Sequence, residues 1–257
     1  MFKKILMFGQ NGLVSYRIKE LLQGQVVALG HDQVNFSNQF EILEALNQHQ
    51  PDLIINAAAY TAVDKAEDEI ELSNQINGYA VGVIAHWARR SDSYVIHFST
   101  DYVFSGELND RKPYKSTDQT NPINQYGRSK LLGEKLLVES GCHYSLYRIS
   151  WIYDRERGKN FYLTIKKLLT EKNEIKVVND QYGMPTQAAW VASEIVQRIK
   201  SRQLEPGITH LAPEGLKTWY DFACEIKAES ASSCEIVPVN SDEYVTKAKR
   251  PKWSKLV

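Results

Sequence analysis

Short apolar stretches alternate with longer amphipathic stretches along most of the chain. Apolar runs with the length of buried strands lie at residues 4–8, 26–29, 53–56, 94–98 and 144–148. Between them, apolar positions recur with helical spacing and predict helices over 12–22, about 40–47 and 125–139, and one long helix that ends near residue 90. Strands that alternate with helices indicate repeated βαβ units, so we expect an α/β fold with a Rossmann-like, doubly wound parallel sheet.

The alternation continues to about residue 150 and then loosens. Residues from about 179 onward mix short strands, helices and turns, as is typical of a smaller region attached to a main sheet. We therefore expect residues 1–150 to form the sheet domain. Residues 151–257 are expected to return partly to the sheet and partly to form a substrate-binding cap. A long polar loop at 105–124 suggests a function for that segment.

Composition narrows the class of protein. Hydrophobic residues make up 43% of the 257 residues, and no run approaches the ~20 apolar residues of a membrane helix, so we expect a soluble protein without a membrane partner. The 31 basic and 31 acidic residues balance, which disfavours nucleic acid as a partner. Three scattered cysteines without a C-x-x-C pair indicate a reducing cytoplasm, and neither they nor the six histidines predict a metal site.

A glycine loop follows the first strand and opens the first helix. Gly9 and Gly12 permit the close backbone approach that a pyrophosphate requires at a helix N-terminus, although an ordinary helix-start turn would use the same residues. Ser15 stands where a third glycine is usual, and no acidic residue ends the second strand, so NADPH and NADH both remain open. Residues 57–60 place mainly small side chains beneath an adenosine or ribose, or in a close helix–sheet contact.

Tyr126 and Lys130 lie four residues apart on one face of a predicted helix, near the carboxyl edge of the parallel sheet. We expect Tyr126 to exchange a proton with a carbonyl substrate, and Lys130 to lower the phenol's pKa from about 10 and to hold a cofactor ribose. Tyr162 and Lys166 repeat this spacing in an amphipathic helix, where we interpret Tyr162 as a packing residue.

Three further residues complete the predicted site at the ends of the fourth and fifth strands. Thr100, rather than Ser99, is expected to donate its hydroxyl to the substrate carbonyl oxygen as negative charge develops there. Asp101 either holds substrate hydroxyls or caps the following turn. Trp151 either stacks under a ring of the substrate or closes the core.

Six motifs occur in an order that resembles the dTDP-4-dehydrorhamnose reductases, extended members of the short-chain dehydrogenase/reductase superfamily. The resemblance covers nearly the whole chain. The motifs are Gly9-Gln-Asn-Gly12, Asn56-Ala-Ala-Ala-Tyr-Thr-Ala-Val-Asp64, Ser99-Thr-Asp-Tyr-Val-Phe104, Tyr126-x-x-x-Lys130, Arg148-Ile-Ser-Trp151 and Asn179-Asp-Gln-Tyr-Gly-Met-Pro-Thr186.

The resemblance implies an oxidoreductase that reduces the C4 ketone of dTDP-4-dehydro-L-rhamnose to dTDP-L-rhamnose, a sugar donor for surface polysaccharide, with hydride from NADPH or NADH. It implies that Tyr126 protonates the new alkoxide and that Lys130 holds the nicotinamide ribose. Thr100, Asp101 and Trp151 would contact the sugar nucleotide, and residues 1–150 would bind the dinucleotide. The implied cofactor contacts are Gly9, Asn11, Gly12, Leu13, Val14, Asn35, Phe36, Ala57, Ala58, Ala59, Tyr60, Tyr126 and Lys130.

The sequence departs from the family pattern at three places. Ser15 replaces a third glycine, and Gly30 and Asn35 stand where many members carry aspartates near the adenosine ribose. In the family, the motif at 250–256 is followed by a further C-terminal helical segment, so we expect this chain to be shorter than the family pattern by a few dozen residues. Some members resemble magnesium-bridged dimers with metal carboxylates partly in that tail, so the resemblance leaves a homodimer and magnesium open here.

Two other functions remain open from the sequence. One is that of another nucleotide-sugar reductase or epimerase of the same superfamily. The other is that of a non-catalytic, dinucleotide-binding regulatory subunit, because the family also resembles the regulatory β subunit of methionine adenosyltransferase. The presence of both Tyr126 and Lys130 favours an enzyme.

Overall fold

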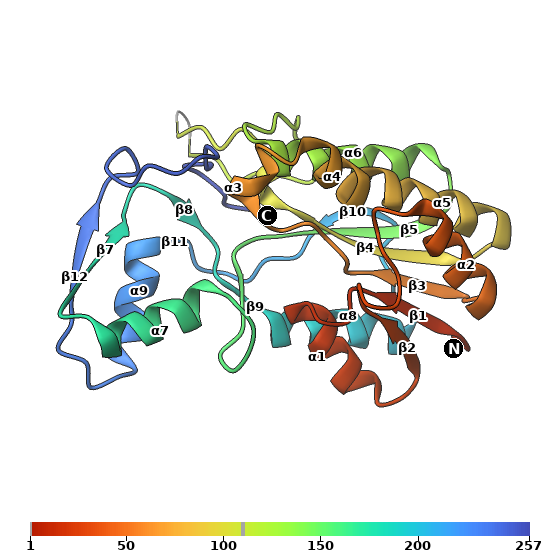
Figure 1. Cartoon of the computed structure of the whole chain (residues 1–257), viewed down its shortest axis with the longest axis horizontal. Coiled ribbons are helices and arrows are strands. Elements are labelled where there is room, and N and C mark those ends of the chain that lie inside the picture. The colour runs from red at the N-terminus through yellow and green to blue at the C-terminus, as the bar shows by residue number, and fades with distance from the viewer. Residues whose placement is uncertain (1, 109–110) are drawn as a thin grey trace.

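The central element is a sheet of six parallel strands. In the computed structural model, which describes residues 2–108 and 111–257, the strands are β1 (Ile5–Phe8), β2 (Val26–Leu29), β3 (Leu53–Asn56), β4 (Tyr94–Thr100), β5 (His143–Ile149) and β10 (Gly207–His210). They are hydrogen-bonded in the order β10-β5-β4-β3-β1-β2 (Figure 1). This order confirms the expected α/β fold with a doubly wound parallel sheet.

Helices cover both faces of the sheet. On one face lie α2 (Gln39–His49), α5 (Ala80–Ser91) and α6 (Gln125–Glu139), and on the other lie α1 (Leu13–Leu22) and α8 (Ala188–Ser201) (Figure 1). Neighbouring residues of a strand point to opposite faces, so Leu6 and Phe8 of β1 pack beneath the first group, whereas Ile5 and Met7 pack beneath the second. Burial on both faces explains why the strands read as continuous apolar runs.

The long helix that the sequence predicts up to residue 90 is interrupted, so that prediction was wrong. The segment forms α3 (Val63–Ala66), α4 (Ile70–Asn74), a π-helical turn η1 (Gln75–Tyr79) and then α5. The buried Asn77 side chain accepts from the Tyr60 N–H at 2.8 Å and donates to the Tyr60 carbonyl at 3.0 Å. A Cβ atom at Gly133 of α6 would lie 2.1 Å from the Asn77 carbonyl oxygen. Packing against α6 and the loop at Tyr60, rather than local spacing, shapes this segment.

A smaller cluster of elements lies beside the sheet, at the left of Figure 1. Helices α7 (Phe161–Glu171) and α9 (Trp219–Ala228) and the parallel pair β7 (Glu174–Val178) and β12 (Glu235–Val239) enclose a separate apolar core. Two short pairs lie between this cluster and the sheet: β6 (Ile152–Tyr153) with β9 (Thr186–Gln187), and β8 (Tyr182–Gly183) with β11 (Lys217–Thr218). The domain boundary expected at residue 150 stays a prediction.

The last segment of the chain joins the smaller cluster to the sheet domain. Arg250 donates to both carboxylate oxygens of Asp64, at 3.1 and 2.7 Å, and the N–H of Ala248 donates to the same carboxylate at 3.0 Å. The N–H of Trp253 donates to the Gly106 carbonyl at 3.0 Å. The hydrogen bond from Arg250 is the main reason that the pKa of Asp64 lies below its ordinary value. Asp64 thus holds the late segment against the early one.

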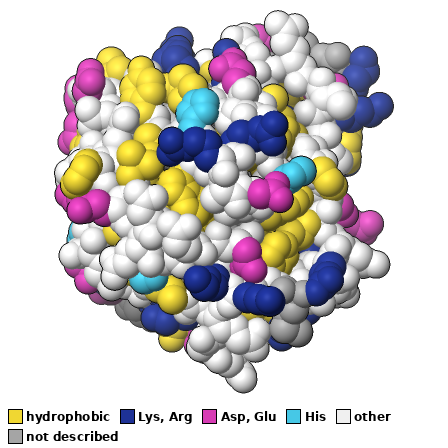
Figure 2. Space-filling view, turned by 90° about the vertical axis from the view of Figure 1, so that its right-hand side faces the viewer, with side chains coloured by type: hydrophobic (Ala, Val, Ile, Leu, Met, Phe, Trp, Pro, Cys, Tyr) yellow, Lys and Arg dark blue, Asp and Glu magenta, His cyan; other side chains and the backbone are white. Residues whose placement is uncertain are grey.

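Charged side chains of both signs are interspersed on the face that Figure 2 shows. A broad area of positive charge, which would attract a polyanion, is not present on that face. Among the described residues, no helix combines the length and the apolar character needed to cross a bilayer.

Replacing Asp64 with Asn should lower the melting temperature by roughly 1–3 °C at neutral pH, because its pair with Arg250 is partly exposed. The lowered pKa of Asp64 means that its carboxylate stabilises the fold above the ordinary pKa and loses this effect as the pH falls through the lowered value. The difference in melting temperature between D64N and wild type should therefore become smaller at acidic pH. Melting curves at neutral and acidic pH test this, with the exposed Glu44→Gln as control, and a pH-independent difference would contradict it.

Candidate active site

A cleft of about 560 Å³ opens at the carboxyl ends of the central strands. A second cavity of about 300 Å³ shares part of its lining and extends to the end of β2. The predicted residues that line the cleft are Asn11, Gly12, Leu13, Val14, Ala57, Ala58, Ala59, Thr100, Asp101, Tyr126, Lys130 and Trp151. Gly9, Asn35 and Phe36 line the second cavity. The fold therefore brings together residues that are far apart in the sequence.

The glycine loop before α1 is shaped by contacts that exclude side chains. Gly9 has a φ of 84°, and a Cβ atom there would lie 2.6 Å from the backbone nitrogen of Ala58. Ser15 is fully buried, and its hydroxyl donates to the carbonyl oxygens of Gly9 at 2.5 Å and Gly12 at 3.1 Å, so serine suits this position. Gly12 caps α1 without a side-chain bond to the N–H groups of the first turn. An anion such as a diphosphate can accept from those groups.

The second cavity has a neutral lining at the end of β2. Gly30, His31 and Asn35 line it there, and none of its lining residues is an acid, a lysine or an arginine. It offers neither the carboxylate that usually holds a ribose 2′-hydroxyl nor an arginine for a 2′-phosphate. Tyr60 lies outside both linings and donates its hydroxyl to Glu69 at 2.7 Å, so its expected contact with a cofactor stays a prediction.

Tyr126 and Lys130 lie on α6 and line the cleft together. The helix approaches the end of β4 closely because residue 127 is glycine: a Cβ atom at Gly127 would lie 2.2 Å from the Tyr102 carbonyl oxygen. Lys130 is buried, and its ammonium group donates to the Phe98 carbonyl oxygen at 2.6 Å. The phenol and the ammonium are thus held at one wall of the cleft by backbone contacts of α6 and β4.

Burial, rather than Lys130, dominates the proton affinity of Tyr126. Burial raises the pKa of Tyr126 to about 12, opposed by a smaller contribution from a hydrogen bond with Thr100. Burial also lowers the pKa of Lys130 to about 8. The ammonium group of Lys130 is directed to the Phe98 carbonyl oxygen, and the expected lowering of the Tyr126 pKa by Lys130 stays a prediction. Tyr126 keeps its proton at neutral pH.

Thr100 and Asp101 lie where β4 ends. The Thr100 Oγ1 atom accepts from the Tyr102 N–H at 3.2 Å and so caps the short 3-10 turn η2 (Asp101–Val103). The same hydroxyl donates to Asp101 Oδ1 at 3.1 Å. Burial raises the pKa of Asp101 to about 6. The turn is therefore capped by the side chain of Thr100 and not by that of Asp101. Contact of Asp101 with a substrate stays a prediction.

Two stacked tryptophans form another wall of the cleft. The rings of Trp151 and Trp219 lie 3.3 Å apart between centroids and are tilted by only 3°. Trp151 has a φ of 46°, and a Cβ atom at Gly183 would lie 2.2 Å from its ring. Trp151 therefore lines the cleft and packs on Trp219 at the same time. Its stacking under a ring of the substrate stays a prediction.

Sequence reasoning missed Trp219, Gly158 and Lys159, which also line the cleft. Trp219 begins α9 directly after a capping box made by Thr218 and Asp221, and that signal can be read in the sequence. Its contact with Trp151 depends on the tertiary structure and leaves no local signal.

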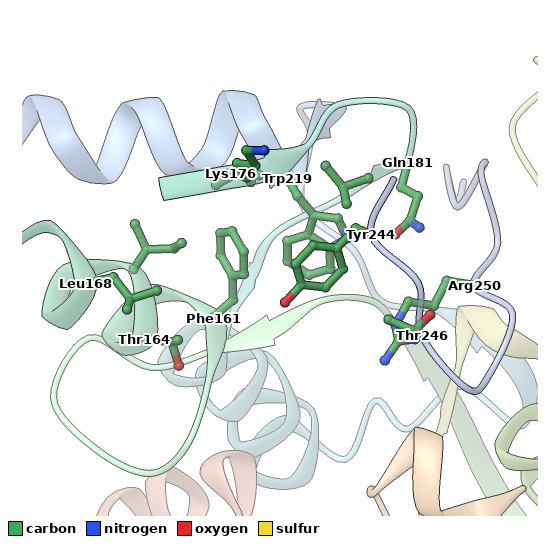
Figure 3. A pocket seen from close by; sticks show the side chains of 12 residues that line it. Phe161, Thr164, Leu168, Lys176, Gln181, Trp219, Tyr244, Thr246 and Arg250 are labelled. Carbon is green, nitrogen blue, oxygen red and sulfur yellow. Dashed lines mark hydrogen bonds between the residues drawn. The ribbon is translucent and has the colours of Figure 1, made fainter. Parts of the chain in front are cut away.

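A smaller cavity of about 240 Å³ lies on the other side of Trp219. Figure 3 shows the aromatic rings of Phe161, Trp219 and Tyr244 along its wall, with Arg250 and Thr246 at one end. Phe161 and Trp219 are in contact, with ring centroids 4.5 Å apart. The cavity thus combines flat apolar walls with a cation, and it shares Trp219 with the lining of the cleft.

Tyr162, the second tyrosine with a lysine four residues later, lies in the core of the smaller cluster. It is buried, and its hydroxyl donates to Glu229 at 2.7 Å. It is not among the residues that line the cleft. These contacts agree with its interpretation as a packing residue.

A buried ion pair lies behind the site. Arg148 of β5 donates to both carboxylate oxygens of Glu134 of α6, at 3.0 and 2.7 Å, and the Ser99 hydroxyl donates to the same carboxylate at 2.5 Å. Glu134 and Arg148 each have side chains only 3% exposed. The pair therefore ties α6, which carries Tyr126, to the two strands that end at the cleft.

Comparisons with known proteins agree with this geometry. A family model described as the RmlD substrate binding domain matches residues 3–257. The dTDP-4-dehydrorhamnose reductase of Salmonella typhimurium is 38% identical, over 98% of this chain and 88% of its own length. A dTDP-4-dehydrorhamnose reductase structure from Clostridium acetobutylicum has a TM-score of 0.92 and 33% identity, covering 99% of this chain and 90% of its own. One from Bacillus anthracis, in complex with NADP, has a TM-score of 0.93 and 30% identity, covering 100% and 91%.

Replacing Glu134 with Gln should lower the free energy of unfolding by roughly 3–5 kcal/mol, because the Arg148 guanidinium would stay buried without a counter-charge. The same replacement at Glu171, whose pair with Lys167 is exposed, should cost less than about 1 kcal/mol. Urea unfolding of both variants measures the difference. Equal and small losses in the two variants would show that the buried pair does not hold α6.

Proposed function

This chain belongs to the dTDP-4-dehydrorhamnose reductase family, and from this premise we propose that it reduces the C4 ketone of dTDP-4-dehydro-L-rhamnose to dTDP-L-rhamnose with NADPH or NADH. The observation that carries the proposal is the shared cleft, in which Tyr126, Lys130 and Thr100 lie opposite a glycine loop. A phenol, an ammonium and a hydroxyl next to a diphosphate site are the groups that carbonyl reduction by a dinucleotide requires.

The residues around the glycine loop suit a dinucleotide. The uncapped N–H groups of α1 would hold its diphosphate, and the second cavity, with Asn35 and Phe36, would hold its adenosine end. Ala57, Ala58 and Ala59 would lie beneath it. The cofactor supplies a hydride when bound, and Lys130 would donate to its ribose.

Tyr126 is the proposed acid. Hydride addition to the ketone carbon breaks the carbon–oxygen π bond and leaves an alkoxide, to which the Tyr126 hydroxyl transfers its proton. The pKa of about 12 means that Tyr126 holds this proton throughout the neutral range, and an alkoxide is basic enough to take it. Thr100, at the end of β4, would donate to the same oxygen as its charge develops. Solvent then returns a proton to Tyr126.

The nucleotide end of the substrate would use the cavity beyond Trp219. The flat rings of Phe161 and Tyr244 suit a nucleobase, and Arg250 would attract phosphate charge. Trp151 and Asp101 would then contact the sugar in the cleft, next to Tyr126.

Other properties follow from the same premise. The three cysteines are free thiols, which supports work in a reducing cytoplasm. Residues 1–150 would bind the dinucleotide, and residues 151–257 would supply most of the substrate contacts. A homodimer rests on the family resemblance alone. In the described part of the chain, no group of three or more His, Cys, Asp or Glu side chains gathers as metal ligands.

Replacing Tyr126 with Phe should lower turnover by roughly a hundredfold or more, because the alkoxide then lacks its proton donor. Loss of NADPH or NADH absorbance with dTDP-4-dehydro-L-rhamnose measures turnover. The matched control is Tyr162→Phe, which removes a hydroxyl bonded to Glu229 outside the cleft and should leave turnover nearly unchanged.

Two outcomes would contradict the proposal in different ways. A folded wild-type protein that binds NADPH but does not reduce this sugar would overturn the substrate and favour another nucleotide sugar or a regulatory subunit. Turnover by Y126F close to that of wild type would instead overturn the assignment of Tyr126 as the acid.

Replacing Trp219 with Leu should raise the KM for the sugar nucleotide by roughly tenfold, because the variant loses one wall of the nucleotide cavity and the partner of Trp151. The KM for NADPH should change much less. Trp190→Leu, which removes a tryptophan that packs against the sheet core, is the control. A larger change in the KM for NADPH than for the sugar nucleotide would place the sugar nucleotide elsewhere.

A further inference from the structure

The ammonium group of Lys130 has two acceptors on the same strand. Its Nζ atom lies 2.6 Å from the Phe98 carbonyl oxygen and 3.4 Å from Nε2 of His97. Lys130 is 2% exposed and His97 is fully buried. These contacts are therefore largely shielded from water, and both acceptors belong to β4, which ends in Thr100.

His97 serves Lys130 as an acceptor. An ammonium group only donates, so the Nε2 atom that faces it carries a lone pair and the ring hydrogen lies on Nδ1. Burial, and to a lesser extent the charge of Lys130, holds the pKa of His97 well below its ordinary value, which keeps the ring neutral. A backbone hydrogen bond with Asn56 acts on this pKa in the opposite direction and by less. The polar contacts of the buried ring are therefore with Lys130 and with the end of β3.

We propose that His97 is a positioning residue for Lys130. Together with the Phe98 carbonyl, it directs the third N–H of the ammonium into the cleft, toward a hydroxyl of the dinucleotide ribose. A single acceptor would leave the ammonium free to rotate about the line from Nζ to that acceptor, whereas two acceptors fix all three N–H directions. Lys130 lines the cleft, so a third N–H directed there can donate to a bound ligand. The identification of the ligand as a ribose rests on the proposed function. The arrangement of the Lys130 ammonium group between two acceptors does not depend on it.

The other charges near Lys130 do not replace His97. Glu134, one turn further along α6, favours the charged form of Lys130, but its oxygens accept from Arg148 of β5 and from Ser99 of β4. Tyr126 on the same helix is neutral, and Asp101 lies beyond Thr100 at the end of β4. The neutral lone pair of His97 is therefore the side-chain acceptor in hydrogen-bond contact with the ammonium group among the described residues.

Three substitutions separate this role from simple packing. In His97→Gln, the amide oxygen can reach the position of Nε2 and accept from Lys130. In His97→Asn, the side chain is one carbon shorter and its oxygen falls near the position of Nδ1. His97→Leu removes the acceptor and keeps the bulk. His210→Gln is the matched control, because the ring nitrogens of His210 are also buried and the ring interacts with the backbone of Tyr114 and Val257 rather than with Lys130.

The measurement is NADPH affinity by fluorescence titration from about pH 6 to pH 10, without any sugar substrate, together with melting temperature. H97Q should bind NADPH within about threefold of wild type, whereas H97N and H97L should lose roughly ten- to a hundredfold, the equivalent of one hydrogen bond to a charged group. The pKa of Lys130, about 8, should fall further without its acceptor, so the alkaline loss of affinity should begin at lower pH in H97N and H97L. H210Q should change the melting temperature only.

The outcomes are distinct. If H97N and H97L bind NADPH as tightly as wild type, with the same pH midpoint, the positioning role is overturned. Equal losses of NADPH affinity in H97Q and H97N would also overturn it, because packing alone predicts that result. If wild type binds NADPH, and H97N and H97L lose affinity while H97Q keeps it, but wild type does not reduce the sugar, the inference stands and the proposed substrate fails. If wild type binds neither NADPH nor NADH, both fail.

Discussion

The close approach of α6 to β4 is the constraint on which the site depends. Glycine at position 127 permits this approach, because a Cβ atom there would lie 2.2 Å from the Tyr102 carbonyl oxygen just beyond β4. Gly133 likewise permits the approach of α6 to η1, where a Cβ atom would lie 2.1 Å from a carbonyl oxygen. The ion pair of Glu134 and Arg148 holds α6 in place across the interior. Without this proximity, the phenol and ammonium carried by the helix would not share a cleft with the hydroxyl at the end of the strand. Small residues and a buried charge pair thus jointly set the spacing of the reactive groups.

Burial has opposite effects on the two titratable groups that α6 presents. It raises the pKa of Tyr126 and lowers that of Lys130, in each case favouring the neutral form. At neutral pH the phenol therefore holds a proton and the amine is mostly charged, which suits donation of a proton to an alkoxide. The same desolvation strengthens each hydrogen bond that Lys130 makes, so the geometry of its acceptors matters more than it would at a surface.

Most of the fold can be predicted from the sequence. Strands that are buried on both faces appear as apolar runs, and the helices between them appear as apolar residues with helical spacing. Residues 125–139 are helical as expected, and Ser15 replaces glycine without disturbing its loop. The interruption at Asn77 depends on packing against α6, which local spacing does not encode. The stacking of Trp151 on Trp219 joins distant segments, and the pKa of Tyr126 depends on how deeply it is buried. These features arise only in three dimensions.

The bond between Asp64 and Arg250 has a consequence for how the molecule is made. Asp64 leaves the ribosome early and its partner late, so the early half of the sheet is synthesised well before the segment that fastens it to the smaller cluster. Until then, the edge near Gly106 lacks the backbone bonds that Trp253 supplies. A nascent chain can thus assemble the glycine loop before α1 well before the segment around Arg250 is available to join the smaller cluster to the sheet.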